Sequence, residues 1–280
     1  MWFPICRTKH LRTLIVVGII TLLTVAACNG DDNANNDNGS DEGQPRLYDW
    51  DRSADAILIR IDEVPLSERE AYRINTIPLC SIWGNGRIIW SNNVIDTNEI
   101  LEGRLSDETI RGFIEDLIGY GFYSWEEDII PPVDEDLTLQ SITVNLYSDP
   151  RTVERYGNWP GQSFDEIVTL CHNLAEERAQ FVPLSGGWVS AYPIEFDTAY
   201  KSQEWPRNAP FTMAELAASE TPFWVEGAWA AELWQYTREV SIMQVTERGE
   251  AYEVAMQVPG ISRSSPPPPP DSGQSDNQED

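Results

Sequence analysis

The sequence predicts an α+β fold, with an antiparallel sheet built from hairpins and helices packed on it. In several short segments apolar residues alternate with polar ones, and turn residues join neighbouring segments in pairs. Two longer segments instead repeat apolar residues every three or four positions, the spacing of a helix that packs on one face. Strands that follow one another as hairpins indicate antiparallel pairing rather than a doubly wound parallel sheet.

The first strand and the first hairpin are predicted from residues 57–62 and 78–90. Residues 57–62 place isoleucine at every second position, which indicates a half-buried strand. Asn85-Gly86 lies between two apolar arms and is the strongest short signal for a hairpin, because both residues of a two-residue turn need a positive φ. Since both sides of each arm are apolar, we expect a central hairpin that is covered on both faces.

The predicted turn also fixes which residues of the hairpin share a face. A two-residue turn pairs Trp83 with Ile88 on one face. On the other face it pairs Ile82 with Ile89, and Cys80 lies two residues from Ile82 on that same face.

Residues 106–120 are predicted to form the first helix. Ser106 can cap its start, and Gly121 suits the left-handed position that ends many helices. Five apolar side chains form one continuous stripe along it: Ile110, Phe113, Ile114, Leu117 and Ile118.

A second hairpin is predicted from residues 142–156, which alternate in the same way as the first strand. A second helix follows from about Phe164 to Gln180, and Ser163 and Glu166 have the spacing of a capping box. The apolar face of this helix carries Cys171.

The remainder of the chain mixes loops with short elements. Residues 181–210 are rich in glycine and proline and are expected to form loops. Thr212 and Glu215 form another capping box, and residues 227–238 are predicted to be helical, although a strand is the alternative there. Residues 240–258 are predicted to form a hairpin through an Arg-Gly turn.

Composition divides the chain into five regions. Residues 1–27 are predicted to be a signal peptide, and residues 28–46 an acidic, disordered tether without large apolar residues. Residues 47–198 are expected to form the main α+β domain. Residues 199–261 would form a C-terminal helix-hairpin subdomain, either separate from or continuous with that domain. Residues 262–280, with five consecutive prolines followed by acidic residues, are expected to be a disordered tail.

The N-terminal region has the pattern of an export signal. Three basic residues precede residues 14–27, an uncharged apolar run of 14 residues. Because a span needs ~20 apolar residues, this run is too short to cross a bilayer and is typical of a secretory signal peptide. It ends in Val25-Ala26-Ala27-Cys28, which resembles the lipobox of bacterial lipoproteins. Ordinary signal cleavage, with Cys28 incidental, is the alternative.

This resemblance implies a location and a modification. In that family the thiol of the lipobox cysteine receives a diacylglycerol, and a peptidase then cuts before it, so Cys28 would become the first residue of the mature chain. The protein would then be anchored to a bacterial membrane through lipid on Cys28 and would lie on the extracytoplasmic side. Two or more acyl chains are needed for a stable anchor.

A second, less specific resemblance covers residues 55–180. The order of strand, hairpin, helix, hairpin and helix is similar to that of uncharacterised globular domains of exported bacterial lipoproteins. The motifs that carry it are GNGRIIW at residues 84–90 and SDETIRGFIEDLIGYGF at residues 106–122. This resemblance implies no known activity.

The charge and the scarcity of histidine exclude several classes of function. The signal region contains three basic residues and no acidic one, so the mature chain would carry 46 acidic and 16 basic residues, a net charge of −30. Such a charge repels nucleic acid and anionic lipid headgroups, and we expect neither as a partner. His172 would be the only histidine left, which excludes multi-histidine metal sites, and we expect neither a cofactor nor a metal.

Cys80 and Cys171 are the only cysteines that remain besides Cys28. An oxidising compartment permits a disulfide between them, provided that the second helix packs on the hairpin face that carries Cys80. Two separate buried thiols are the alternative, because a free cysteine packs well as a small apolar residue.

Tryptophan suggests a binding function. Trp159, Trp188 and Trp205 lie in segments between the predicted elements, where exposed indoles can stack on a sugar ring or a peptide. We therefore expect a non-enzymatic binding or cell-envelope role, with a glycan or an envelope protein as the partner. A carbohydrate- or cell-wall-binding module is one alternative.

A hydrolase is a further alternative. Two carboxylates can cleave a glycosidic bond, and residues 126–136 contain six acidic residues. His172 is a weak candidate for a base, because neighbours on a helix such as Cys171 and His172 point in different directions. Runs of charge between elements are usually solvated, so we expect no enzyme here.

Overall fold

The chain folds into two mostly antiparallel sheets with helices packed on them, and the predicted α+β class is confirmed. In the computed structural model, all of the described residues belong to one compact unit, Pro45–Asp280. Within it the structure describes residues 48–65, 69–92, 99–130, 138–174, 180–182, 184–238, 244–264 and 266–270.

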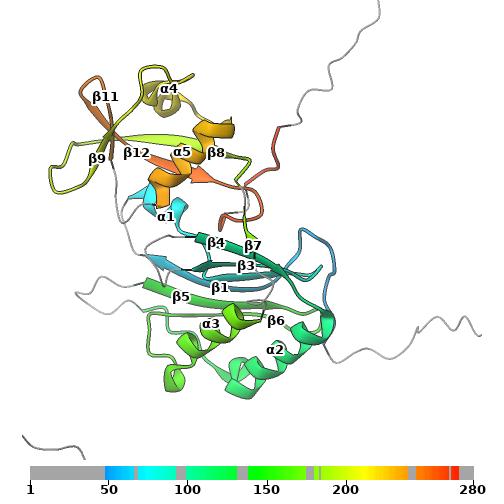
Figure 1. The fold of residues 1–280 in the computed structure, drawn as a ribbon. Coiled ribbons are helices and arrows are strands. Elements are labelled where there is room, and N and C mark those ends of the chain that lie inside the picture. Colours follow the sequence, from blue (N-terminus) through cyan, green and yellow to red (C-terminus); the bar gives the residue numbers. More distant parts are fainter. Residues whose placement is uncertain are drawn as a thin grey trace, which may run out of the picture. The chain divides into compact units, whose positions relative to one another are not determined.

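The first sheet has seven strands in the order β6-β5-β1-β2-β3-β4-β7, and all neighbours are antiparallel. The strands are β1 (Ile57–Pro65), β2 (Cys80–Trp83), β3 (Arg87–Asn92), β4 (Glu99–Arg104), β5 (Thr138–Asn145), β6 (Pro150–Arg155) and β7 (Gln180–Phe181). Figure 1 shows two helices, α2 (Asp107–Tyr120) and α3 (Ser163–Asn173), on the same face of this sheet. Two single turns of 3-10 helix, η1 (Phe122–Ser124) and η2 (Pro160–Gln162), precede β5 and α3.

The second sheet has five strands in the order β10-β8-β12-β11-β9. Its strands are β8 (Gly186–Ile194), β9 (Ser202–Glu204), β10 (Phe223–Glu226), β11 (Gln244–Glu247) and β12 (Glu250–Gln257). Only the short pair of β11 with β9 is parallel among the described strands. Helices α1 (Glu70–Asn75), α4 (Met213–Ala218) and α5 (Gly227–Arg238) contact this sheet.

The central hairpin has a different register from the predicted one. Ile82 pairs with Ile88, rather than with Ile89, because the loop contains three residues instead of two. The Gly86 N–H donates to the Trp83 carbonyl, and Gly86 itself has a φ of 86°. A tight turn followed by a left-handed glycine is the usual three-residue hairpin loop.

This shift exchanges the residues on the two faces of the hairpin. Cys80 and Ile82 share a face with Ile88, whereas Trp83 shares the opposite face with Ile89. The expectation that both faces are covered is confirmed. The first core fills the face under α2 and α3, and a second core continues from Trp83 and Ile89 to the strands of the second sheet.

The first long helix begins and ends as predicted. The Ser106 hydroxyl accepts a hydrogen bond from the Thr109 N–H, and Gly121 adopts the left-handed conformation with a φ of 88°. The start of α3 differs from the prediction. Ser163 lies inside the helix rather than at its cap, because a 3-10 turn leads directly into it, and the prediction of a capping box there is wrong. The predicted extension to Gln180 is also wrong, since Gln180 begins β7.

The C-terminal elements follow the sequence closely. Residues 227–238 are helical, Thr212 and Glu215 form the predicted capping box, and β11 and β12 join through Arg248 and Gly249. The main omission is β8, which occupies part of the segment expected to form loops. Because β8 pairs with β12, the predicted domain boundary between residues 198 and 199 does not coincide with the division between the sheets.

The C-terminal tail begins later than expected. Ser262 is buried, and Arg263 forms an ion pair with Asp62 of β1, so residues 262–264 are part of the folded body. The predicted signal peptide, the whole of the predicted tether and residues 271–280 lie outside the described residues.

Candidate functional site

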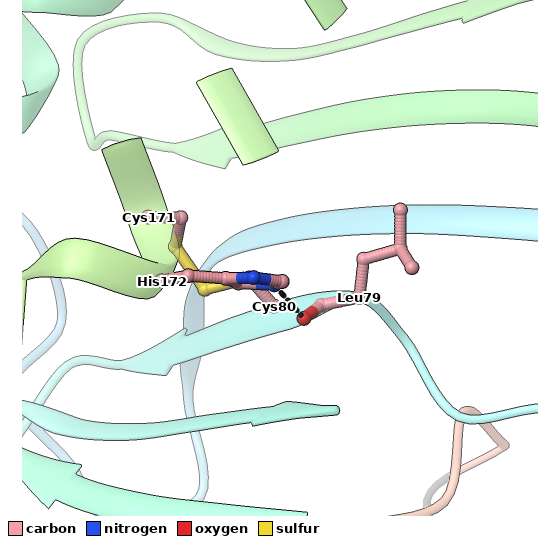
Figure 2. The surroundings of a disulfide bond; sticks show 4 residues. All are labelled: Leu79, Cys80, Cys171 and His172. Carbon is pink, nitrogen blue, oxygen red and sulfur yellow. Dashed lines mark hydrogen bonds between the residues drawn. A yellow bond between two sulfur atoms is a disulfide. The ribbon is translucent and has the colours of Figure 1, made fainter. Parts of the chain in front are cut away.

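The structure places Cys80 and Cys171 in a disulfide (Figure 2). Cys80 begins β2 and Cys171 lies in the last turn of α3, and their Cα atoms are 6.5 Å apart. Both residues are fully buried in the first core. A disulfide without solvent access is suited to holding α3 on the sheet and not to thiol exchange, which needs access for an attacking thiolate.

His172 lies beside this disulfide and points toward the Leu79 carbonyl, just before β2 (Figure 2). Its Nε2 lies 3.0 Å from the Leu79 carbonyl oxygen. Because a carbonyl oxygen only accepts, Nε2 carries the proton. Burial lowers the pKa of His172, and the hydrogen bond to Leu79 offsets part of that effect. His172 is therefore a neutral residue that fastens α3 to the start of β2, in agreement with a structural role.

Trp159 and Trp205 do not offer the exposed faces that ligand stacking requires, which corrects the sequence expectation. Trp159 is 9% exposed, stacks on Phe164 and donates its indole N–H to the Gln140 side chain. Trp205 is 2% exposed, stacks on Phe211 and donates to that residue's carbonyl. Both indoles pack in the cores against further aromatic side chains, including Trp125 beside Trp159 and Trp229 of α5 beside Trp205.

Trp188 is different, because it is only half-buried. It lies in β8 directly opposite Trp224 of the edge strand β10, and the two ring centroids are 5.3 Å apart in an edge-to-face arrangement. Such pairs stabilise each other beyond their buried area. The two indoles form a half-exposed surface at one edge of the second sheet, which we call the tryptophan pair.

A glycine makes room for the tryptophan pair. Gly186 lies two residues before Trp188 on the same face of β8, and a Cβ atom there would come within 2.7 Å of the Trp224 ring. The Trp224 ring therefore lies across the backbone of β8. Any side chain at Gly186 would lift the ring from the sheet.

The chain's own C-terminal segment crosses the sheet beside this pair. The Gln257 side chain of β12 donates to the Ser264 hydroxyl at 2.5 Å, and Gln257 is the strand partner of Trp188. Trp188 then donates its indole N–H to the Pro267 carbonyl at 2.8 Å. The segment thus passes from β12 toward β8, where Pro266 is half-buried and Pro267–Pro270 are exposed.

The acidic residues expected between η1 and β5 are only partly described. Asp128 forms an ion pair with Arg155, whose guanidinium also donates to the Glu126 carbonyl. Asp134, Glu135 and Asp136 lie outside the described residues. Among the described side chains, no group of three or more histidine, cysteine or acidic residues could hold a metal ion.

Cys28 also lies outside the described residues, so its lipidation stays a prediction. Within the part of the chain that the structure describes, no helix has the length and apolarity needed to cross a bilayer. Trp224 was missed in the sequence analysis, although Phe223, Trp224 and Val225 form a short run of residues that favour a strand.

Comparison with known proteins adds no further assignment. No protein-family model matches the chain, and neither the curated proteins nor the solved structures contain a match to it.

Proposed function

We propose that this chain is a lipid-anchored, extracytoplasmic protein of the bacterial envelope that binds a partner without catalysing a reaction. The observation that carries the binding role is the tryptophan pair, two half-exposed indoles that face each other on a sheet edge. Aromatic side chains of this kind supply a large contact area together with a directional N–H donor, and they dominate many binding surfaces.

Two features support the location. The apolar run that ends in Val25-Ala26-Ala27-Cys28 has the order of a lipoprotein signal. The buried pair of Cys80 and Cys171 is of the kind that persists in oxidising compartments outside the cytoplasm. Acyl chains on Cys28 would hold the folded body at a membrane surface.

The alternatives fit the geometry less well. The planes of the two indoles are inclined by 63°, so the pair offers two separate contacts and not the continuous flat platform that suits a row of sugar rings. A carboxylate-based hydrolase that used Asp128 as one of its two acids would first have to release it from its ion pair with Arg155.

Fatty-acid labelling in a bacterial host tests the anchoring. We expect the native chain to incorporate labelled palmitate and to sediment with membranes, and Cys28→Ala to lose both properties. Cys6→Ala is the matched control and should label normally, because Cys6 leaves with the signal. Equal labelling of Cys28→Ala and the native chain would contradict the proposal, and turnover of glycosides by the purified protein would contradict its non-catalytic part.

A further inference from the structure

The contact between Trp188 and Pro267 has the chemistry by which proteins recognise proline-rich segments. Proline has no N–H, so a run of prolines forms an extended polyproline II helix whose carbonyl oxygens have no internal partner. Aromatic grooves bind such segments by packing on the rings and by donating hydrogen bonds to these carbonyls. The indole N–H of Trp188 donates to the Pro267 carbonyl at 2.8 Å in this way, and Pro266 is half-buried.

We propose that the tryptophan pair is a recognition site for polyproline II segments. In this chain the site is occupied by the start of its own proline run, Pro266 and Pro267, and a basic, proline-rich segment of another envelope protein displaces it. This inference rests on the binding role proposed above and names the ligand class for the same surface.

The base of the tail stays in place when the prolines leave. Arg263 is paired with Asp62, Ser264 with Gln257, and the Ser262 hydroxyl accepts the Val258 N–H inside the fold. The segment that can move begins after Ser264, only three residues before Pro267. Such a short connection keeps the effective concentration of the tail at its site in the millimolar range. The tail therefore competes with any external ligand. A ligand must bind strongly enough, or be concentrated enough, to displace it.

Charge indicates which ligand can do so. The prolines are followed by Asp271, Asp276, Glu279 and Asp280, on a mature chain that we expect to carry a net charge of −30. The acidic end of the tail is repelled by the rest of the molecule, whereas a proline-rich segment with arginine or lysine beside its prolines is attracted. The site should discriminate against acidic proline-rich ligands for the same reason.

Nuclear magnetic resonance of the indole N–H groups tests the inference on the mature chain, residues 28–280. Trp188→Phe identifies the Trp188 signal, because it keeps an aromatic ring but removes the indole N–H together with part of the aromatic surface. The probes are three synthetic peptides: five prolines followed by three arginines, the same prolines followed by three aspartates, and five glycines followed by three arginines. A second protein variant replaces Pro266–Pro270 with glycine and serine, which leaves the base of the tail intact.

We expect the proline-arginine peptide to shift the Trp188 signal of the native chain. The variant without prolines should bind it at least ~10-fold more tightly, because the competing tail is gone. Trp188→Phe should lose ~10-fold in affinity, while Trp159→Phe, which changes a buried indole in the other core, should leave it unchanged.

Three outcomes would overturn the inference. The first is that the native chain and the proline-free variant bind the proline-arginine peptide with equal affinity. The second is that the proline-arginine and glycine-arginine peptides bind equally well. The third is that the Trp188 signal responds to oligosaccharides of the cell wall but not to peptides. Failure of palmitate labelling would refute the anchoring and leave these results as they stand, so the two proposals can fail separately.

Discussion

Arg263 binds Asp62 through two nitrogens of its guanidinium, although 201 positions separate the two residues in the sequence. Asp62 is 3% exposed and lies in β1, so the carboxylate is buried in the first sheet. The same guanidinium donates to the carbonyls of Glu63 and Arg73, and Arg60 donates to the Arg263 carbonyl. The residues just after the last strand are thereby fastened to β1 and α1.

Removal of the guanidinium should destabilise the protein strongly. Arg263→Ala leaves the buried Asp62 carboxylate without its counter-charge, and breaking a buried pair in this way costs about 3–5 kcal/mol. Urea unfolding at neutral pH measures the loss. Arg52→Ala is the control, because the pairs of Arg52 with Asp49 and Asp107 are exposed and should contribute no more than ~1 kcal/mol. Similar losses in the two variants would show that the buried pair contributes no more to the free energy of unfolding than the exposed pairs do.

The sequence predicts an element correctly where interactions between residues close in the sequence determine its ends or its register. Helix α2 was predicted with both ends because Ser106 and Gly121 cap it through their own chemistry. The presence of the first hairpin was predicted correctly, but its register was not, because Asn85-Gly86 suits loops of two or three residues. Distant backbone decides between the two lengths, since the Leu105 N–H donates to the Gly86 carbonyl.

The candidate site was largely beyond sequence reasoning for the same reason. Gly186 and Gly187 were interpreted as loop, yet they lie in a strand because the Trp224 ring and the Met256 side chain occupy the space that their side chains would need. Arg263 and the prolines after it have the composition of a coil. Their partners Asp62 and Trp188 lie far away in the sequence, and no local pattern connects them.

The disulfide should account for a large share of the stability. It links residues 91 positions apart, and cross-linking a loop of that length reduces the entropy of the unfolded chain by an amount worth about 4.6 kcal/mol in the chain-entropy model. We expect the Cys80→Ala/Cys171→Ala protein to have a midpoint of urea unfolding well below that of the native chain. Mass spectrometry without reduction supplies the direct test, because two alkylatable thiols in the folded, exported protein would disprove the link.

Gly84 should tolerate no side chain. A Cβ atom there would lie 1.6 Å from the Asp51 carbonyl oxygen, and the Gly84 carbonyl accepts the Trp50 indole N–H at 3.0 Å. Gly84→Ala must therefore displace the backbone around Asp51, and we expect a loss of at least ~2 kcal/mol in the free energy of unfolding.

Gly112→Ala is the matched control. Gly112 is exposed in α2 with no atom near its Cβ position, and this change should stabilise the helix by ~1 kcal/mol. If the two substitutions had the same effect, the close approach at Gly84 would not constrain the fold.

His172 should make the stability of the mature chain fall in mild acid. Burial lowers its pKa below the unfolded value of ~6.5, so below that pH the unfolded chain takes up a proton that the folded chain does not. The free energy of unfolding therefore decreases as the pH falls from ~6.5 toward the folded pKa, by at most about 1.4 kcal/mol per pH unit.

His172→Gln keeps a nitrogen donor for the Leu79 carbonyl but cannot titrate, so it should lose this part of the slope. Because we expect His172 to be the only histidine of the mature chain, urea unfolding of both proteins between pH 7.5 and 5.5 isolates its effect, and parallel curves would refute it.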